Sequence, residues 1–312
     1  MAPDRNASAV TDTVTDAATG AVTDTATGAG VVRRPNRPAL GRTGGLRLVG
    51  RYALLLFVSF VVLFPVYATV IGAFKPSGKV LQNPLLPDAF TLDVLGDAWS
   101  EGRLGRFILN SLVVAVIVTV CQVATSVMSG YAFAMLEFPG RGPLFVVFLM
   151  TLLVPLEATL IVNRRTIDSL GWLNTYQGLA GPFLATAFGT FLLRQVFLGF
   201  PQELRDAARI DGAGHARFLW NVALPVIRPS VGALALFGFL SSWNQYLWPN
   251  LITTESDMNT VQSGLRLLRY STLDRPNLLM AGTVIAAVPI TAALLVFQRQ
   301  LVRGLTAGAV KG

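Results

Sequence analysis

Thirty consecutive residues without a charged side chain, from Phe107 to Leu136, constrain the fold more than any other feature of this sequence. A helix of about 20 apolar residues crosses the roughly 30 Å hydrocarbon core of a bilayer, whereas a membrane-spanning strand needs only about 9–11 residues. Over the whole chain, 53% of the residues are hydrophobic and only 13% are charged. Since backbone polar groups inside lipid must bond within the spanning structure, the sequence predicts an all-helical protein that crosses the membrane several times.

The distribution of charges divides the chain into six expected spans. Charges are concentrated between the apolar segments, where loops return the chain across the bilayer. The spans are expected at about residues 52–74, 107–136, 143–162, 176–200, 231–251 and 278–298. The segments between them at about residues 75–105, 163–175 and 252–277 are expected to be loops on the outer side.

The N-terminal region differs from the rest in composition. Residues 1–47 contain a degenerate repeat of Thr, Ala, Asp and Gly with little bulky apolar surface, so we expect a disordered tail. Six arginines between Arg33 and Arg51 precede the first span and favour a cytoplasmic N-terminus. Six crossings then place both termini in the cytoplasm, with residues 48–312 forming the membrane domain.

Composition and motifs exclude several classes of function. The net charge of +8 is better explained by cations retained on the cytoplasmic side than by nucleic acid, because no basic stripe is interleaved with exposed aromatics. No GxxxxGK[ST] phosphate loop occurs, so no ATP hydrolysis of the usual kind is expected. Cys121 and His215 are the only residues of their types. We therefore predict no catalytic residues, no metal site and no cofactor.

The polar stretch at residues 201–217 is the long hydrophilic interruption late in the chain. Pro201 is placed to open a short helix and Gly212 to close it. Leu204, Ala207 and Ala208 are spaced to share one face of that helix. We expect the helix to dock on a protein outside the bilayer; a helix that lies on the lipid surface is the alternative.

The same stretch carries a family resemblance. The residues that carry it are Asp206, Ala207, Ala208, Gly212, Val222, Leu224 and Pro225. Their spacing resembles a cytoplasmic motif in permease subunits of ATP-driven bacterial importers: Glu-Ala-Ala, three residues, Gly, nine residues, Ile, one residue and Leu-Pro. Here Asp stands in place of Glu and Val in place of Ile. The run ELRDAARIDGAG, which begins at Glu203, resembles the carbohydrate branch of this family, and WNQYLWP resembles its maltose and glycerol 3-phosphate permeases.

The resemblance implies a fold, partners and a cargo. The fold would be the type I importer permease fold, with a cytoplasmic coupling helix. The partners would be an ABC ATPase dimer, a second permease subunit, an extracytoplasmic solute-binding protein and membrane lipid, without nucleic acid. The cargo would be a carbohydrate or sn-glycerol 3-phosphate. The coupling residues implied by the motif are Glu203, Asp206, Ala207, Ala208, Gly212, Leu224 and Pro225.

Polar residues within the expected spans are candidates for the translocation path. Glu157 lies in the third span, where it either lines the path, faces a wet cavity mouth, or pairs with Arg164 or Arg165. Ser241, Ser242, Asn244 and Gln245 are expected near the middle of the fifth span, where they either line the path or hold helices together.

Two other functions are open on the sequence alone. A stand-alone secondary carrier would transport without ATP and often shows an internal repeat, which is not evident here. A membrane-embedded enzyme would need clustered catalytic side chains, which a single histidine and a single cysteine do not favour.

Overall fold

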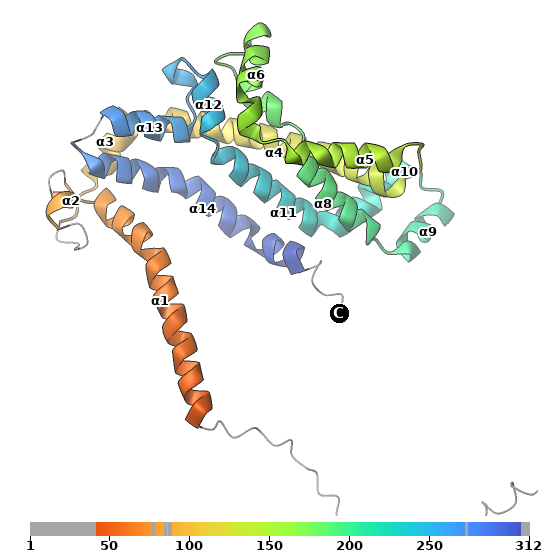
Figure 1. The fold of residues 1–312 in the computed structure, drawn as a ribbon, viewed down its shortest axis with the longest axis horizontal. Helices are drawn as coiled ribbons and strands as arrows, with labels where there is room; N and C mark the ends of the chain where they lie inside the picture. The colour runs from red at the N-terminus through yellow and green to blue at the C-terminus, as the bar shows by residue number, and fades with distance from the viewer. Residues whose placement is uncertain (1–41, 77–78, 84–85, 87–88, 272–273, 307–312) are drawn as a thin grey trace, which may run out of the picture. The chain divides into compact units, whose positions relative to one another are not determined.

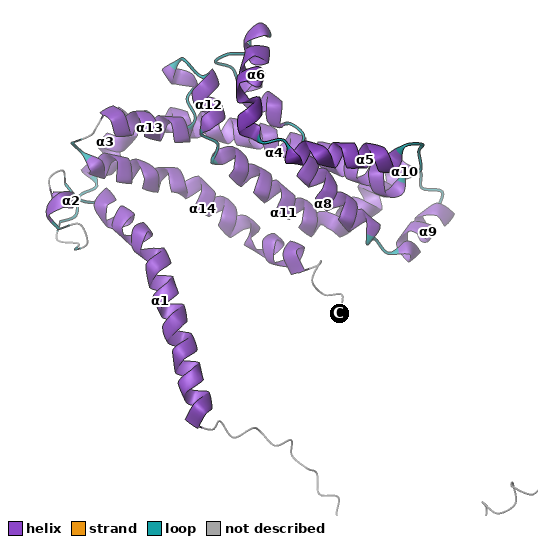
Figure 2. Ribbon diagram, in the orientation of Figure 1, coloured by secondary structure: helices purple, strands orange, loops and turns teal. Residues whose placement is uncertain are grey.

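The computed structural model describes residues 42–76, 79–83, 86, 89–271 and 274–306, and in these ranges the regular structure is helical without a strand (Figures 1 and 2). The chain divides into two compact units at Val58 and Ser59. The boundary falls within helix α1, Arg42–Ala73. Residues 1–41 of the predicted tail lie outside the described residues, and residues 42–47 belong to α1.

Four helices in the described residues are long and apolar enough to cross a membrane. In three of them the charged residues lie only near the ends, so each can remain helical through the hydrocarbon core, whereas His215–Trp243 also contains Arg228 in its middle. Three agree with the predicted first, second and sixth spans: α1, α4 (Leu104–Met135) and α14 (Pro276–Thr306). The fourth, His215–Trp243, joins α10 (His215–Phe218), the π-helical turn η3 (Leu219–Ala223) and α11 (Leu224–Trp243).

The predicted third span is not one straight helix. Helix α5 (Arg141–Met150) continues through the 3-10 turn η1 (Thr151–Leu153) and is followed by α6 (Leu156–Ser169) at an angle of 96°. Pro155, in an extended conformation, separates the two parts. Proline cannot donate a helical hydrogen bond and disfavours a helical residue before it, which explains the break at this position.

The predicted fourth span is also broken. Helix α7 (Tyr176–Ala180) and the 3-10 turn η2 (Gly181–Phe183) precede α8 (Ala187–Leu198), with a bend of 47°. The carbonyl of Phe183, the last residue before the break, accepts a hydrogen bond of 2.8 Å from the Gln122 side chain of α4. A polar side chain thus satisfies backbone that the bend has freed within the apolar bundle. If each bent pair is one span, the six expected crossings are accounted for.

The predicted fifth span, residues 231–251, is wrong in its boundaries. The helix begins at His215, ends at Trp243 and is followed by the separate helix α12 (Leu247–Ile252). A π-helical turn relieves the clash that a proline makes with a preceding turn, so the helix continues into Pro225. The four polar residues expected in mid-span therefore lie at its C-terminal end.

The predicted loops contain helices of their own. These are α2 (Lys79–Gln82), α3 (Asp93–Glu101), the second half of α6, the 3-10 turn η4 (Ser256–Met258) and α13 (Val261–Ser271). In α13 the apolar positions Val261, Leu265 and Leu268 recur at helical spacing, and Val261 and Leu268 are buried. The bundle covers the apolar side of this amphipathic helix. The charged residues of the segment led to the prediction of a loop and concealed the apolar positions between them.

Helix α4 is the centre of the bundle in the second unit. It packs against α8 and α11, and α11 packs in turn against α14 (Figure 1). Close packing with α8 depends on Gly130, where an added Cβ would lie 3.0 Å from the backbone nitrogen of Arg194 and 3.1 Å from Cβ of Leu193. Small residues at such positions let membrane helices approach closely.

A substitution of Gly130 by valine is expected to separate α4 from α8. The added atoms would meet backbone, which yields less readily than a flexible side chain, and overpacking of this kind costs about 1–3 kcal/mol of unfolding free energy. Denaturant-induced unfolding of the purified protein in micelles measures this loss. Gly142→Val is the matched control, since a Cβ on Gly142 meets nothing within 4 Å; equal stability of the two variants would contradict the packing argument.

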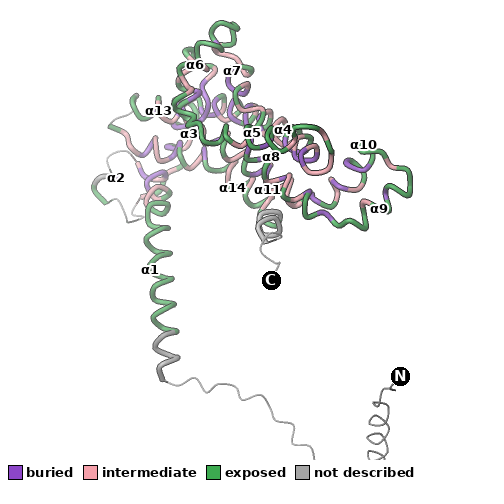
Figure 3. Tube along the Cα trace, turned by 45° about the vertical axis from the view of Figure 1, so that its right-hand side comes forward, coloured by how far each residue is buried: buried purple, intermediate pink, exposed green. Residues whose placement is uncertain are grey.

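Much of the chain on the outside of the second unit is exposed (Figure 3), and many of the exposed residues are large and apolar. On α5 and the following turn, Val147 is 60% exposed and Leu153 is 81% exposed. So many exposed apolar side chains are unfavourable in water, and such a surface meets lipid or other protein. The distribution of exposed residues thus agrees with a membrane protein.

Candidate functional site: the polar loop between α8 and α11

Helix α9 (Gln202–Ile210) lies in the predicted coupling loop, residues 201–217, and has the predicted start and stop. Pro201 precedes its first residue, and Gly212 follows its end with φ of +68°. The amide of Gly212 donates to the Arg209 carbonyl at 3.0 Å, and the amide of Ala213 donates to the Ala208 carbonyl at 2.9 Å. This pair of bonds is the Schellman ending, in which a glycine takes the left-handed position.

One side of α9 is fixed to its own bundle. Ala208 is 7% exposed and belongs to a core cluster with Tyr131 of α4, Phe197 of α8 and Phe218 of α10. The predicted apolar docking face is therefore divided, because Ala208 points inward while Leu204 and Ala207 are exposed. Ala208 contacts this chain rather than being free for a partner, which corrects its expected place on the docking face.

The opposite side of α9 is open and mixed in character. Its exposed members at helical spacing are Glu203, Asp206, Ala207 and Ile210, and Ile210 is 87% exposed. Among the described residues, neither Glu203 nor Asp206 forms an ion pair or a side-chain hydrogen bond. This side of the helix thus presents two unpaired carboxylates and an exposed isoleucine, while Ala208 on the other side holds the helix against the bundle.

The loop continues directly into a long helix. The Tyr131 hydroxyl and Nδ1 of His215 share a hydrogen bond of 2.9 Å, which joins α4 to the first residue of α10. Leu224 and Pro225 lie nine and ten residues farther on, at the junction of the π-helical turn with α11. Leu224 packs against the same core cluster as Ala208. Packed side chains therefore join α9 to the helix that ends at Trp243.

The translocation-path candidates are not gathered into one cluster. Glu157 is exposed in the first turn of α6, after the break at Pro155. It makes no ion pair with Arg164 or Arg165 in the described structure, so the predicted pairing is absent. The position is nevertheless favourable for a carboxylate, since the N-terminal turn of a helix carries partial positive charge.

The second group of candidates lies at the C-terminal end of α11. Ser242 is partly buried, Asn244 follows the last helical residue, and Gln245 is in the turn before α12. The side-chain amide of Asn244 donates to the Leu240 carbonyl at 2.8 Å, and so caps the helix. A capping role accounts for Asn244 without a cargo molecule.

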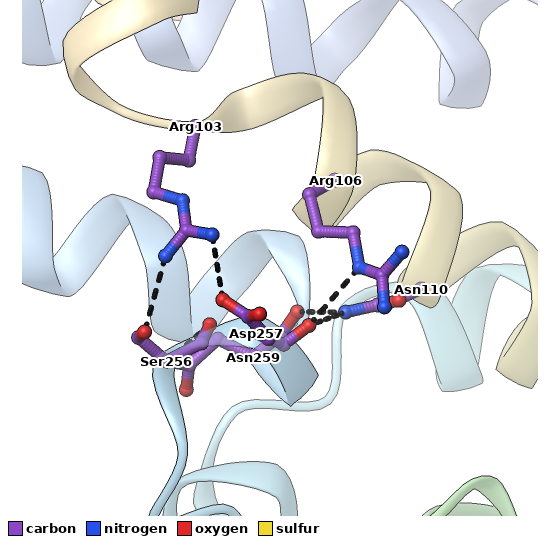
Figure 4. Close-up of polar contacts among 6 residues, drawn as sticks. All are labelled: Arg103, Arg106, Asn110, Ser256, Asp257 and Asn259. Atoms are coloured by element: carbon purple, nitrogen blue, oxygen red, sulfur yellow. Dashed lines mark hydrogen bonds and ion pairs between the residues drawn. The ribbon is translucent and has the colours of Figure 1, made fainter.

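A polar cluster at the N-terminal end of α4 was not foreseen from the sequence (Figure 4). Asn110 is fully buried, and its side-chain amide donates to the carbonyls of Asp257 at 2.7 Å and Asn259 at 3.0 Å. The Tyr176 hydroxyl donates to Oδ1 of Asn110 at 2.8 Å. Three segments far apart in the sequence thus converge on one asparagine.

An exposed ion pair lies beside this cluster. The Arg103 guanidinium forms an ion pair of 2.6 Å with the carboxylate of Asp257 and donates to Ser256 (Figure 4). The Arg275 guanidinium pairs with Glu101, and this hydrogen bond raises the pKa of Arg275. Because both pairs are exposed, they position the segments more than they stabilise them.

Residues 43–307 match the family described as "Binding-protein-dependent transport system inner membrane component". The chain belongs to this family. The protein is therefore a permease subunit in the inner membrane, with an all-helical fold. The stand-alone secondary carrier considered above is not supported by this assignment.

Similar proteins agree with the assignment. The permease is 36% identical over 265 residues to the sn-glycerol-3-phosphate transport system permease protein UgpE of Yersinia pestis, covering 81% of this chain and 94% of that protein. It is 33% identical over 261 residues to the arabinooligosaccharides transport system permease protein AraQ of Halalkalibacterium halodurans, covering 82% and 94%. Its fold matches a chain of a bacterial ABC transporter involved in the import of the acidic polysaccharide alginate, with a TM-score of 0.75, 21% identity and coverage of 84% and 99%.

Proposed function

We propose that this permease subunit forms a translocation path together with a second, different permease, and that a separate ABC ATPase dimer drives it through α9. The observation that carries the proposal is the two-sided construction of α9: Ala208 holds one side in the bundle core, while Glu203 and Asp206 stand unpaired on the other. A helix held in this way can act as a lever, because a force on its outer side reaches the bundle without being absorbed by a flexible loop.

The lever acts on a continuous core. ATP-driven closure of the ATPase dimer moves α9, and the cluster of Ala208, Tyr131, Phe197 and Phe218 carries that movement to α4, α8 and α10. The breaks within the third and fourth spans are places where the bundle can rearrange between inward-open and outward-open states. Packed helices of this kind switch between discrete arrangements rather than deforming continuously.

The cargo that we propose is a carbohydrate or sn-glycerol 3-phosphate, delivered by an extracytoplasmic solute-binding protein. The names of the relatives support this range of cargo. Hydrolysis of ATP belongs to the partner, and α9 faces the cytoplasm together with both chain termini. The proposed path residues are Glu157, Ser242, Asn244 and Gln245. The side chain of Asn244 also caps α11.

Reversal of the Asp206 charge tests the proposed docking. Asp206→Arg is expected to leave the unfolding free energy within about 0.5 kcal/mol, because the side chain is exposed. Its affinity for the ATPase subunit, measured by titration of the two purified proteins in micelles, should fall by about tenfold or more, since like charges across an interface cost several kcal/mol.

The control for this prediction is Asp168→Arg, an equally exposed carboxylate on α6. That variant should bind the ATPase subunit as the unmodified permease does. If Asp206→Arg binds with unchanged affinity, or if the purified permease alone transports cargo without ATP, the proposed coupling through α9 is wrong.

A further inference from the structure

A cavity of about 110 Å³ lies on the inner side of α9, between this helix and the C-terminal end of α4. Its polar lining consists of Arg205 and Arg209 from α9, the Tyr131 hydroxyl and His215. No carboxylate lines it, although Glu203, Asp206 and Asp211 belong to the same loop. The cavity therefore presents hydrogen-bond donors and positive charge without a balancing negative group.

The charges of Arg205 and Arg209 are not balanced by a carboxylate among the described residues. In the described part of the chain, neither Arg205 nor Arg209 forms an ion pair. The one hydrogen bond of Arg205 goes to the sulfur of Met135 at 3.4 Å, and sulfur is a weak acceptor. Guanidinium groups in such a setting are suited to an anion with several oxygens, such as a phosphate group, which they contact through two parallel hydrogen bonds.

The position of the cavity indicates where the anion comes from. Tyr131 and Met135 belong to the last turns of α4, one of the candidate spans, so the cavity lies at the surface end of a membrane helix. Met135 and Phe218 add an apolar wall. Trp220 follows on the same helix as His215 and is 60% exposed, and tryptophan is typical of the headgroup level of a bilayer.

We propose that this cavity binds the phosphate group of an anionic lipid headgroup from the cytoplasmic leaflet. This proposal rests on the proposed function, which places α9 on the cytoplasmic side of the membrane. Basic pockets at the cytoplasmic ends of membrane helices attract anionic headgroups in this way. The bound phosphate group bridges α9 to α4 and α10, so that lipid composition sets how firmly the lever is joined to the bundle.

The test is a titration of the permease, co-purified with its partner subunits in detergent, with dihexanoylphosphatidylglycerol. The double variant Arg205→Gln and Arg209→Gln should bind this lipid about 25-fold more weakly, at roughly fivefold for each arginine. Arg217→Gln is the matched control, because Arg217 is exposed on α10 and does not line the cavity. Should the double variant misfold, Arg209→Gln alone removes an exposed guanidinium and is expected to weaken binding about fivefold.

Three outcomes decide the proposal. Equal binding of the lipid by the double variant and the unmodified permease overturns it. Saturable binding of inorganic phosphate that depends on the two arginines, without any preference for lipid, keeps the anion site but overturns its lipid source. Unchanged lipid binding together with loss of the ATPase subunit overturns it in favour of a partner carboxylate. Retention of the ATPase subunit by the unmodified permease is scored separately, so failure of this site and failure of the proposed coupling are distinguishable.

Discussion

Replacement of Gly212 by valine is expected to reduce coupled transport by about tenfold or more, because the left-handed backbone costs a residue with a Cβ about 1–2 kcal/mol and costs β-branched residues most. Gly212 has φ of +68° at the end of α9. Valine would either keep this strained conformation or change the direction in which the chain leaves the helix. The second outcome turns Glu203 and Asp206 away from the partner, since the Schellman hydrogen bonds would be lost. Cargo uptake and cargo-stimulated ATP hydrolysis in reconstituted vesicles measure the effect.

Gly214 supplies a close control in the same loop. A Cβ added at Gly212 or at Gly214 meets nothing within 4 Å, so neither substitution creates a clash. Gly214 has φ of −69° and ψ of 169°, an extended conformation that valine adopts readily. Gly214→Val should therefore transport normally. Equal loss in both variants would show that bulk rather than backbone geometry matters, and normal transport by Gly212→Val would contradict the proposed lever.

The sequence was sufficient for the features that depend on local chemistry. The charge-free segments predicted the spans that became α1, α4 and α14, because hydrophobic length is enough to define a crossing. Pro201 and Gly212 predicted the two ends of α9, since each restricts or permits one backbone conformation. The residues of the family motif lie on this helix and at the junction with α11, and their coupling role is part of the proposed function.

Features that depend on distant contacts could not be predicted. The break before α6 lies in a run as apolar as its neighbours, and Pro155 alone does not distinguish a kink from a bend of 96°. The direction of Ala208 depends on Tyr131, Phe197 and Phe218, which come from other helices. The choice among the faces of a short helix is made by tertiary packing, so Ala207 and Ala208 were placed together when the fold separates them.

The cluster around Asn110 depends most strongly on residues that are distant in the sequence. Its disruption is expected to lower the free energy of unfolding substantially. Its amide bonds reach Asp257 and Asn259, 147 and 149 residues away, so no local pattern could have indicated them. Asn110→Leu removes both donors and the acceptor of the Tyr176 hydroxyl. Buried polar groups left without partners cost about 1–3 kcal/mol each, so we expect the unfolding free energy to fall by about 2–5 kcal/mol. Denaturant-induced unfolding of the permease in micelles measures this change.

Two further variants separate lost hydrogen bonds from a general disturbance of packing. Asn221→Leu changes an exposed asparagine that has no side-chain hydrogen bond among the described residues, and it should leave the stability nearly unchanged. Tyr176→Phe removes one donor from the cluster and should destabilise the unmodified permease. In the Asn110→Leu background the same change should cost nothing or restore some stability, because it removes a hydroxyl that has already lost its acceptor. Fully additive losses would mean that Tyr176 and Asn110 act independently. This result would contradict the conclusion that the buried asparagine joins α4 and α7 to the segment after α12.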